Sequence, residues 1–248
     1  MSGHNRWSKI KRQKAAMGAS KGKLYTKIIK EITVAARLGG GNPDGNARLR
    51  AAIGAAREAN MPSDTVARAI KKGTGELEGE SYEEVTYEGY GPGGVAVMVE
   101  CLTDNRNRTA SDVRILFNKG GGNLGTEGAV GWMFHKKGVI TVKPGLTEDQ
   151  VMEKAIEAGA EDVIPLGAEG FEVRTAPVDL HTVASSLEAA GLKLGEQKWS
   201  FFPQTTVKLE GDNARKMLKL MDSLEDNDDV QNVHANFEID EALMESLQ

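Results

Sequence analysis

The chain has 248 residues and a formal net charge of −5; 40% of its residues are hydrophobic and 5% are aromatic. This length suits two or three domains with cores of their own, and so few aromatic residues argue against a broad stacking surface for single-stranded nucleic acid. Cys101 is the only cysteine, which excludes an intramolecular disulfide and a thiolate metal cluster and fits a reducing, cytoplasmic location. The longest apolar run, 93–99, is far shorter than the ~20 residues that cross a bilayer, so we expect no membrane partner.

The first elements are helical. Residues 1–20 are predicted to form a flexible arm, because they are rich in glycine, serine and charge. A helix is predicted over 21–38, since its apolar residues recur at the helical period and cations occupy the opposite face. These cations are Lys23, Lys27, Lys30 and Arg37. Two further helices, over 47–59 and 63–72, would complete a small bundle, with Val66, Ala67 and Ile70 facing inward from the second of them.

The pattern changes to α/β after a glycine-rich and acidic linker at 74–81. Two strands joined by a Gly-Pro-Gly-Gly turn are predicted first, followed by a helix. Residues 135–203 then follow the order β-α-β-β-α-β, which is typical of ferredoxin-like domains. The last part of the chain supplies a strand, a helix and a strand. The predicted strands are 85–90, 95–102, 138–142, 162–165, 170–174, 196–202, 205–209 and 230–236, and the predicted helices are 109–119, 147–158, 179–190 and 212–224.

Neither 79–134 nor 204–248 has enough strands for a stable sheet of its own. We therefore predict an α+β fold in which an N-terminal three-helix bundle is followed by two ferredoxin-like α/β domains, one inserted in the other. The expected domains are 1–78, a discontinuous domain made of 79–134 with 204–248, and an inserted domain at 135–203.

Charge is divided unevenly along the chain. The first 30 residues hold nine Lys or Arg and no Asp or Glu, and residues 1–75 carry 16 basic and 4 acidic side chains, against 15 and 32 in the remainder. Ordinary soluble helices interleave the two signs, so this segregation indicates that the front end meets a polyanion. A transit peptide is the alternative for the first residues, but they hold more Lys than Arg and lead directly into a predicted helix; no apolar segment follows that would make a secretory signal.

The candidate nucleic-acid contacts are basic residues of this front end and one tryptophan. They are Arg6, Trp7, Lys9, Lys11, Arg12, Lys14, Lys21, Lys23, Lys27, Lys30 and Arg37. Lysines contact phosphate rather than base edges, so we expect modest sequence specificity. Two alternatives stay open: the cations are solvated helix faces, and Trp7 packs on the bundle rather than stacking on a base.

Two weaker candidates follow from position. Arg106 and Arg108 follow a strand and open a helix, where free backbone N–H groups can hold an anion; a polar loop capped by Asn105 or Asn107 is the alternative. The acidic turn at 222–229 is interpreted as a solvated loop, with repulsion of nucleic acid or contact with the basic arm as alternatives.

No pattern indicates catalysis. The glycines of 120–125 lack the Gly-Lys-Ser/Thr of a phosphate-binding loop, and the four histidines stand far from one another and from the cysteine. We expect no enzymatic activity, no metal, no cofactor and no small-molecule substrate.

Several long strings resemble the YebC/PmpR family. They lie at 3–7, 22–27, 31–37, 60–62, 70–75, 87–94 and 102–108. The resemblance covers essentially the whole chain and implies three domains, one helical and two α/β. Two local departures occur in the arm, at Asn5-Arg6 and at 18–21, where the family often has Ser-Lys and Asp-Ala-Lys-Arg.

The resemblance implies a regulator of gene expression. Bacterial members are described as transcriptional regulators that bind promoter DNA. Mitochondrial relatives activate translation, and some bacterial members associate with the ribosome and relieve stalls on proline-rich stretches. The prediction is a non-catalytic nucleic-acid-binding protein, a DNA-binding transcriptional regulator in the first instance. The alternative is a ribosome-associated translation factor whose partner would be ribosomal RNA.

Overall fold

A computed structural model describes residues 21–240, and residues 1–20 and 241–248 lie outside the described part. The described residues form two compact units, the first from residues 21–134 and 203–240 and the second from residues 135–202. None of the helices between residues 21 and 240 combines the length and apolar character needed to cross a bilayer. Short 3-10 turns occur at Pro92–Gly94, Gly131–Met133 and Gly167–Glu169.

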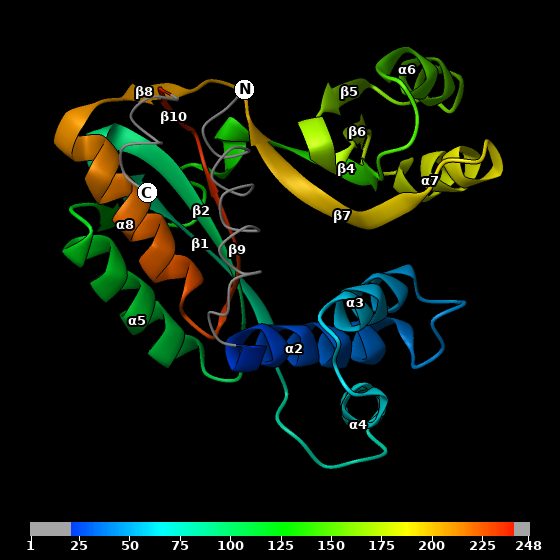
Figure 1. Cartoon of the computed structure of the whole chain (residues 1–248). Coiled ribbons are helices and arrows are strands. Elements are labelled where there is room, and N and C mark those ends of the chain that lie inside the picture. Colours follow the sequence, from blue (N-terminus) through cyan, green and yellow to red (C-terminus); the bar gives the residue numbers. More distant parts are fainter. Residues whose placement is uncertain (1–20, 241–248) are drawn as a thin grey trace. The chain divides into compact units, whose positions relative to one another are not determined.

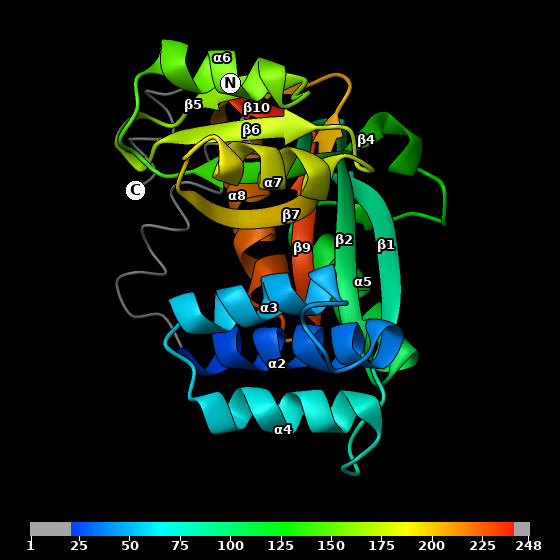
Figure 2. The same ribbon diagram turned by 90° about the vertical axis from the view of Figure 1, so that its right-hand side faces the viewer.

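The first unit begins with three helices, α2 (Lys21–Gly39), α3 (Ala47–Glu58) and α4 (Ser63–Thr74). Helix α2 lies between the other two and packs against both (Figure 2). Their core is built from small and branched side chains, among them Ile32, Leu49 and Ala56, all fully buried. Gly73 faces the Thr33 carbonyl oxygen of α2 so closely that a Cβ would not fit. Small residues therefore allow α2 and α4 to approach tightly.

The predicted inward face of α4 needs one correction. Ala69 is buried whereas Ala67 is exposed, so the packed residues are Val66, Ala69, Ile70 and Gly73. The cause is the close approach at Gly73, which turns this edge of the helix toward α2.

The rest of the first unit is an antiparallel sheet with helices on one face (Figure 1). Its elements are β1 (Glu83–Gly91), β2 (Val95–Thr103), α5 (Arg106–Lys119), β3 (Asn123–Leu124), β8 (Val207–Leu209), α8 (Gly211–Glu225), β9 (Val230–Ala235) and β10 (Phe237–Ile239). The sheet order is β3-β1-β2-β9. The strand β2 is central and pairs with β1 over nine residues and with β9 across a register shift at Glu100/Cys101.

The prediction that 205–209 joins this sheet is wrong. β8 is only three residues long and pairs in parallel with β10 in a separate two-stranded sheet. The outer place beside β1 is taken by β3, which was not predicted. Glycines permit this: Gly122 packs on the Tyr90 carbonyl oxygen and Gly89 on the Asn123 carbonyl oxygen, with no room for a Cβ at either position. The glycine-rich stretch after α5 is thus explained by close packing on β1.

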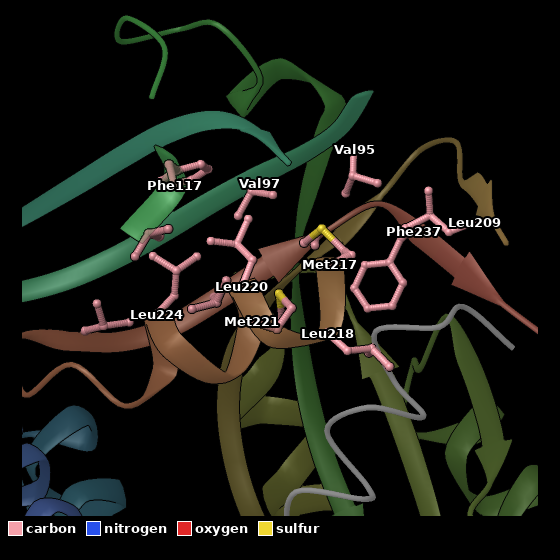
Figure 3. Packing of buried hydrophobic residues seen from close by; sticks show 14 of the residues in the cluster. Val95, Val97, Phe117, Leu209, Met217, Leu218, Leu220, Met221, Leu224 and Phe237 are labelled. Atoms are coloured by element: carbon pink, nitrogen blue, oxygen red, sulfur yellow. The ribbon is translucent and has the colours of Figure 1, made fainter. Parts of the chain in front are cut away.

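The core of this unit lies between the sheet and helices α5 and α8 (Figure 3). Alternate residues of β2, Val95, Val97 and Val99, point toward the helices and are fully buried, as the strand period requires. Met217 of α8 and Phe117 of α5 meet them. Burying a side chain such as Phe117 stabilises the folded state by about 1.5–3 kcal/mol.

A buried carboxylate holds the loop that follows β3. Glu88 accepts hydrogen bonds from the backbone N–H groups of Gly128 (3.0 Å), Val130 (2.6 Å) and Gly131 (2.6 Å). Burial raises the pKa of Glu88, but these three donors outweigh it and hold the pKa below its ordinary value. The charged form of Glu88 therefore stabilises the loop.

The second unit contains β4 (Phe134–Val142), α6 (Glu148–Glu157), β5 (Asp162–Pro165), β6 (Phe171–Thr175), α7 (Leu180–Ala189) and β7 (Leu194–Pro203). Their chain order is β-α-β-β-α-β, and the sheet order is β5-β6-β4-β7. Thr147 and Gln150 form a capping box at the start of α6. Ile140, Val173, Val183 and Leu187 join the two helices to the sheet in one buried cluster.

Candidate nucleic-acid interface

Six of the predicted contacts belong to the arm and lie outside the described residues. They are Arg6, Trp7, Lys9, Lys11, Arg12 and Lys14. The structure places the other predicted contacts on α2 and at the start of α5.

The lysine face of α2 meets the end of α8. Lys23 Nζ lies 2.6 Å from Asp226 Oδ2 and donates to the Asp226 carbonyl oxygen at 3.1 Å. Lys27 Nζ donates to the carbonyl oxygen of Glu225 at 2.6 Å. The last carbonyls of a helix lack intrahelical partners and carry partial negative charge. These lysines therefore cap the C-terminal end of α8.

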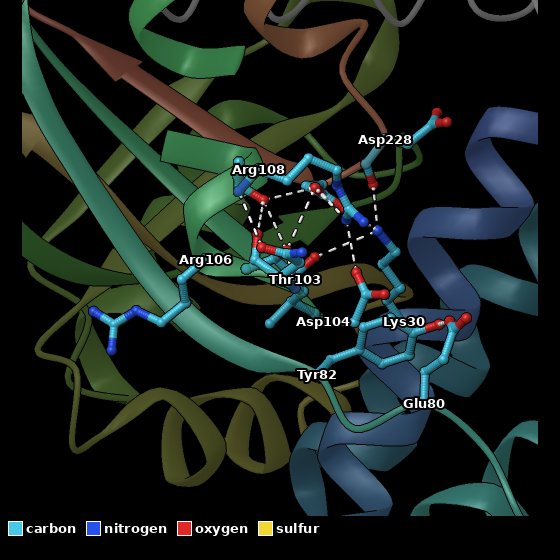
Figure 4. Close-up of polar contacts among 12 residues, drawn as sticks. Lys30, Glu80, Tyr82, Thr103, Asp104, Arg106, Arg108 and Asp228 are labelled. Carbon is cyan, nitrogen blue, oxygen red and sulfur yellow. Dashed lines mark hydrogen bonds and ion pairs between the residues drawn. The ribbon is translucent and has the colours of Figure 1, made fainter. Parts of the chain in front are cut away.

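One lysine of this face is buried. Lys30 Nζ lies 2.5 Å from Asp229 Oδ1, and the two side chains are 8% and 7% exposed. Lys30 also donates to the Asp228 carbonyl oxygen at 3.0 Å. Asp229 further accepts from Thr109 Oγ1 at 2.7 Å and from Arg108 Nη2 at 3.0 Å, in the polar cluster drawn in Figure 4. We call the Lys30–Asp229 pair the latch, because it ties α2 to the start of β9.

The latch fixes the charge state of Asp229. Burial raises the pKa of its carboxyl group, but hydrogen bonds from Lys30, Thr109 and Arg108 outweigh burial, and the pKa lies below its ordinary value. The carboxylate of Asp229 is therefore charged at neutral pH.

The structure corrects the predicted open stripe. Lys30 is buried, and Lys23 and Lys27 are engaged by the turn at 225–229, within the acidic segment 222–229 that the sequence pattern predicts to be a solvated loop. Lys23 and Lys30 are thus paired with carboxylates of the first unit.

The two remaining predicted residues of α2 lie at its ends. Lys21 is exposed at the first position of the helix. Arg37 is exposed, but it donates to Ser81 Oγ at 2.6 Å and to the Tyr82 carbonyl oxygen at 2.5 Å. Arg37 therefore holds the segment that leads into β1.

The start of α5 behaves as a capped polar loop. The helix begins at Arg106, three residues before the predicted start, and the Asn105 side chain accepts from the Arg108 N–H at 3.0 Å. Arg108 Nη2 lies 2.6 Å from Asp104 Oδ1 as well as close to Asp229. Arg106 is exposed, and its Nη1 lies 3.8 Å from Glu83 Oε2. The arrangement engages Arg108 with carboxylates and favours the capping alternative over an anion site.

A cavity of about 410 Å³ adjoins the latch. Its charged lining consists of Lys30, Glu80, Asp104, Arg108, Asp112, Asp228 and Asp229. Five carboxylates against two cations give it negative charge, so it disfavours a polyanion. Within residues 21–240, no group of three or more His, Cys, Asp or Glu could hold a metal ion.

Exposed cations that we did not predict lie on the other two helices of the bundle. Arg68, Lys71 and Lys72 occupy the outward face of α4, and Arg50 and Arg57 are exposed on α3. The i, i+3, i+4 spacing of the α4 residues is the signal that could have identified them.

Comparison with known proteins defines the class. The family model described as the TACO1/YebC protein N-terminal domain matches residues 5–76, and the model described as the TACO1/YebC second and third domain matches residues 82–237. The chain belongs to the TACO1/YebC family, which confirms the resemblance found in the sequence.

Particular relatives match over the full length. A "probable transcriptional regulatory protein" of Myxococcus xanthus is 73% identical and covers 100% of this chain and 99% of its own. A protein of the same name from Citrifermentans bemidjiense is 59% identical, with 100% of both chains covered. The crystal structure of a conserved hypothetical protein from Aquifex aeolicus superposes with a TM-score of 0.83 at 53% identity, covering 90% of this chain and 92% of that one.

Proposed function

We propose that this protein is a non-catalytic, nucleic-acid-binding regulator of gene expression that acts in the cytoplasm as a DNA-binding transcriptional regulator. Full-length relatives carry the name of probable transcriptional regulatory proteins. The observation that carries the proposal for this chain is the segregation of charge, with nine cations and no acid in the first 30 residues. Such a segment attracts phosphates and supplies sequence-independent affinity.

The structure narrows which cations are available. Because the turn at 225–229 engages Lys23, Lys27 and Lys30, we assign the contact to the arm rather than to the lysine face of α2. The proposed arm contacts are Arg6, Lys9, Lys11, Arg12 and Lys14, with Trp7 as a stacking residue. Lys21, exposed at the start of α2, would extend them.

In this proposal the acidic turn and the basic arm have different roles. The turn at 225–229 holds α2 in place through its lysines, so the bundle is fixed within the first unit. The arm then meets the polyanion from a fixed base. Since phosphates carry no sequence information directly, specificity would be modest unless DNA shape adds to it.

The test compares the two candidate targets of this protein in the cell, promoter DNA and the ribosome. Chromatin mapping and ribosome co-sedimentation at physiological salt are done with the wild type and with the Lys9→Ala/Lys11→Ala/Arg12→Ala/Lys14→Ala variant. The proposal predicts promoter occupancy that the variant loses. A variant with four exposed lysines of other regions replaced, Lys143, Lys193, Lys208 and Lys216, is the charge-matched control. Ribosome association without promoter occupancy would contradict the transcriptional role and establish the translation factor instead.

A further inference from the structure

The outward face of α4 is a compact group of cations. Arg68, Lys71 and Lys72 lie at i, i+3 and i+4, which places their side chains on one side of the helix, about 5–6 Å apart at the Cβ atoms. All three are exposed, and the packed residues Ala69 and Ile70 point the other way into the bundle. Figure 2 shows α4 at the outer side of the bundle, with α2 on its other side.

These cations differ from the paired cations of the first unit. Arg48 pairs with both Glu31 and Glu84, and Lys30 and Arg108 share Asp229. Over the described residues 21–240, the side chains of the α4 group make no ion pair and no hydrogen bond.

Local acids do not account for the group. Asp64 lies one turn before Arg68, and no ion pair joins the two side chains. Glu76 follows the helix, but its carboxylate accepts from Thr74 Oγ1 at 3.0 Å. Lys71 and Lys72 lie in the last turn, where a positive charge interacts favourably with the helix dipole. Arg68 lies a turn earlier, where this interaction is weak. The helix dipole therefore explains the positions of Lys71 and Lys72 but not that of Arg68.

We propose that Arg68, Lys71 and Lys72 of α4 form a second phosphate-binding surface for duplex DNA, separate from the arm. The proposal rests on the proposed function and adds to it a contact on a folded element. Contacts from a rigid helix face would fix how the bundle is oriented on the DNA phosphate backbone. Cations of the arm alone would not fix that orientation.

The test measures salt-dependent binding of the full chain to a duplex DNA of about 30 base pairs by fluorescence anisotropy. The variant Arg68→Ala/Lys71→Ala/Lys72→Ala is compared with Arg215→Ala/Lys216→Ala/Lys219→Ala on α8, which removes the same charge from exposed positions. We expect the α4 variant to lower the slope of log K against log salt by about 0.9 for each lost phosphate contact, roughly eightfold in affinity per contact at 0.1 M salt. The α8 control should bind within about twofold of the wild type, since it loses only long-range attraction that salt screens.

The outcomes separate the two proposals. If the wild type binds duplex DNA and both triple variants bind alike, the α4 surface is refuted while the arm contact stands. If the wild type shows no salt-dependent binding at all, the proposed function fails and this inference with it. The variant Arg68→Gln/Lys71→Gln/Lys72→Gln must show the same loss as the alanine variant, and unfolding curves that overlay with the wild type exclude a folding defect; a loss seen with alanine but not with glutamine contradicts the proposal.

Discussion

Replacing Asp229 with alanine removes the one carboxylate within residues 21–240 that is bonded to the buried Lys30 ammonium. The Lys30 side chain is 8% exposed, so water cannot take over the contact without a change in packing. Removing one member of a buried ion pair costs about 3–5 kcal/mol, because the remaining charge stays buried and unpaired. Thr109 and Arg108 lose an acceptor as well, but Lys30 keeps the Asp228 carbonyl oxygen and Arg108 keeps Asp104, which places the expected loss in the lower part of that range.

Chemical unfolding followed by circular dichroism measures this loss as a fall in the free energy of unfolding of the first unit. Asp212→Ala is the matched control, because Asp212 pairs with Lys216 on the surface of α8 and its loss should leave the transition unchanged. The double variant Lys30→Met/Asp229→Ala should recover part of the loss, since no buried charge remains. A loss for Asp229→Ala no larger than that of the control would refute the latch.

Three further predictions concern the first unit. Gly73→Ala should destabilise the bundle by about 1–3 kcal/mol, because the new methyl group would press on the Thr33 carbonyl oxygen; an unchanged thermal midpoint would contradict the close packing of α2 on α4. Glu88→Gln should cost about 2 kcal/mol and raise hydrogen exchange at Val130, since the backbone donors lose a charged acceptor; unaltered exchange there would count against the role of Glu88. The folded pKa values of Asp229 and Glu88 are both lowered, so their stabilisation is complete above the unfolded values of about 4 and disappears as the pH falls through the lower folded values. A titration of unfolding free energy should show this decline below about pH 4, and a smaller one in Asp229→Ala; equal declines would argue that Asp229 is not ionised in the fold.

Periodicity predicted the described elements well where the pattern is local. The helix over 21–38 and the strands over 85–90 and 95–102 lie within α2, β1 and β2, because the helix follows the helical period and the two strands flank a Gly-Pro-Gly-Gly turn. Two-residue β3 carries no such pattern, and its place beside β1 depends on the small size of Gly89. The α+β class with N-terminal helices and two antiparallel sheets is confirmed; the boundaries of the three domains stay a prediction.

The sequence predicts the positive charge of the candidate site but not which of its lysines are exposed to solvent. Lys30 belongs to a cationic face in the helical pattern of its own segment. Its partner Asp229 lies 199 residues away, and nothing in the local sequence of α2 indicates that contact. The assignment of the acidic turn at 222–229 failed for the same reason: a run of carboxylates is typical of a solvated loop until the fold brings the lysines of α2 to it.

Photo-crosslinking of the full chain to duplex DNA, with the crosslinked peptides identified by mass spectrometry, tests the central claim most directly. The account predicts crosslinks in residues 1–20 and in α4, and none at Lys30. Crosslinks confined to residues 135–202, or crosslinks at Lys30 with the arm and α4 unmarked, would contradict it.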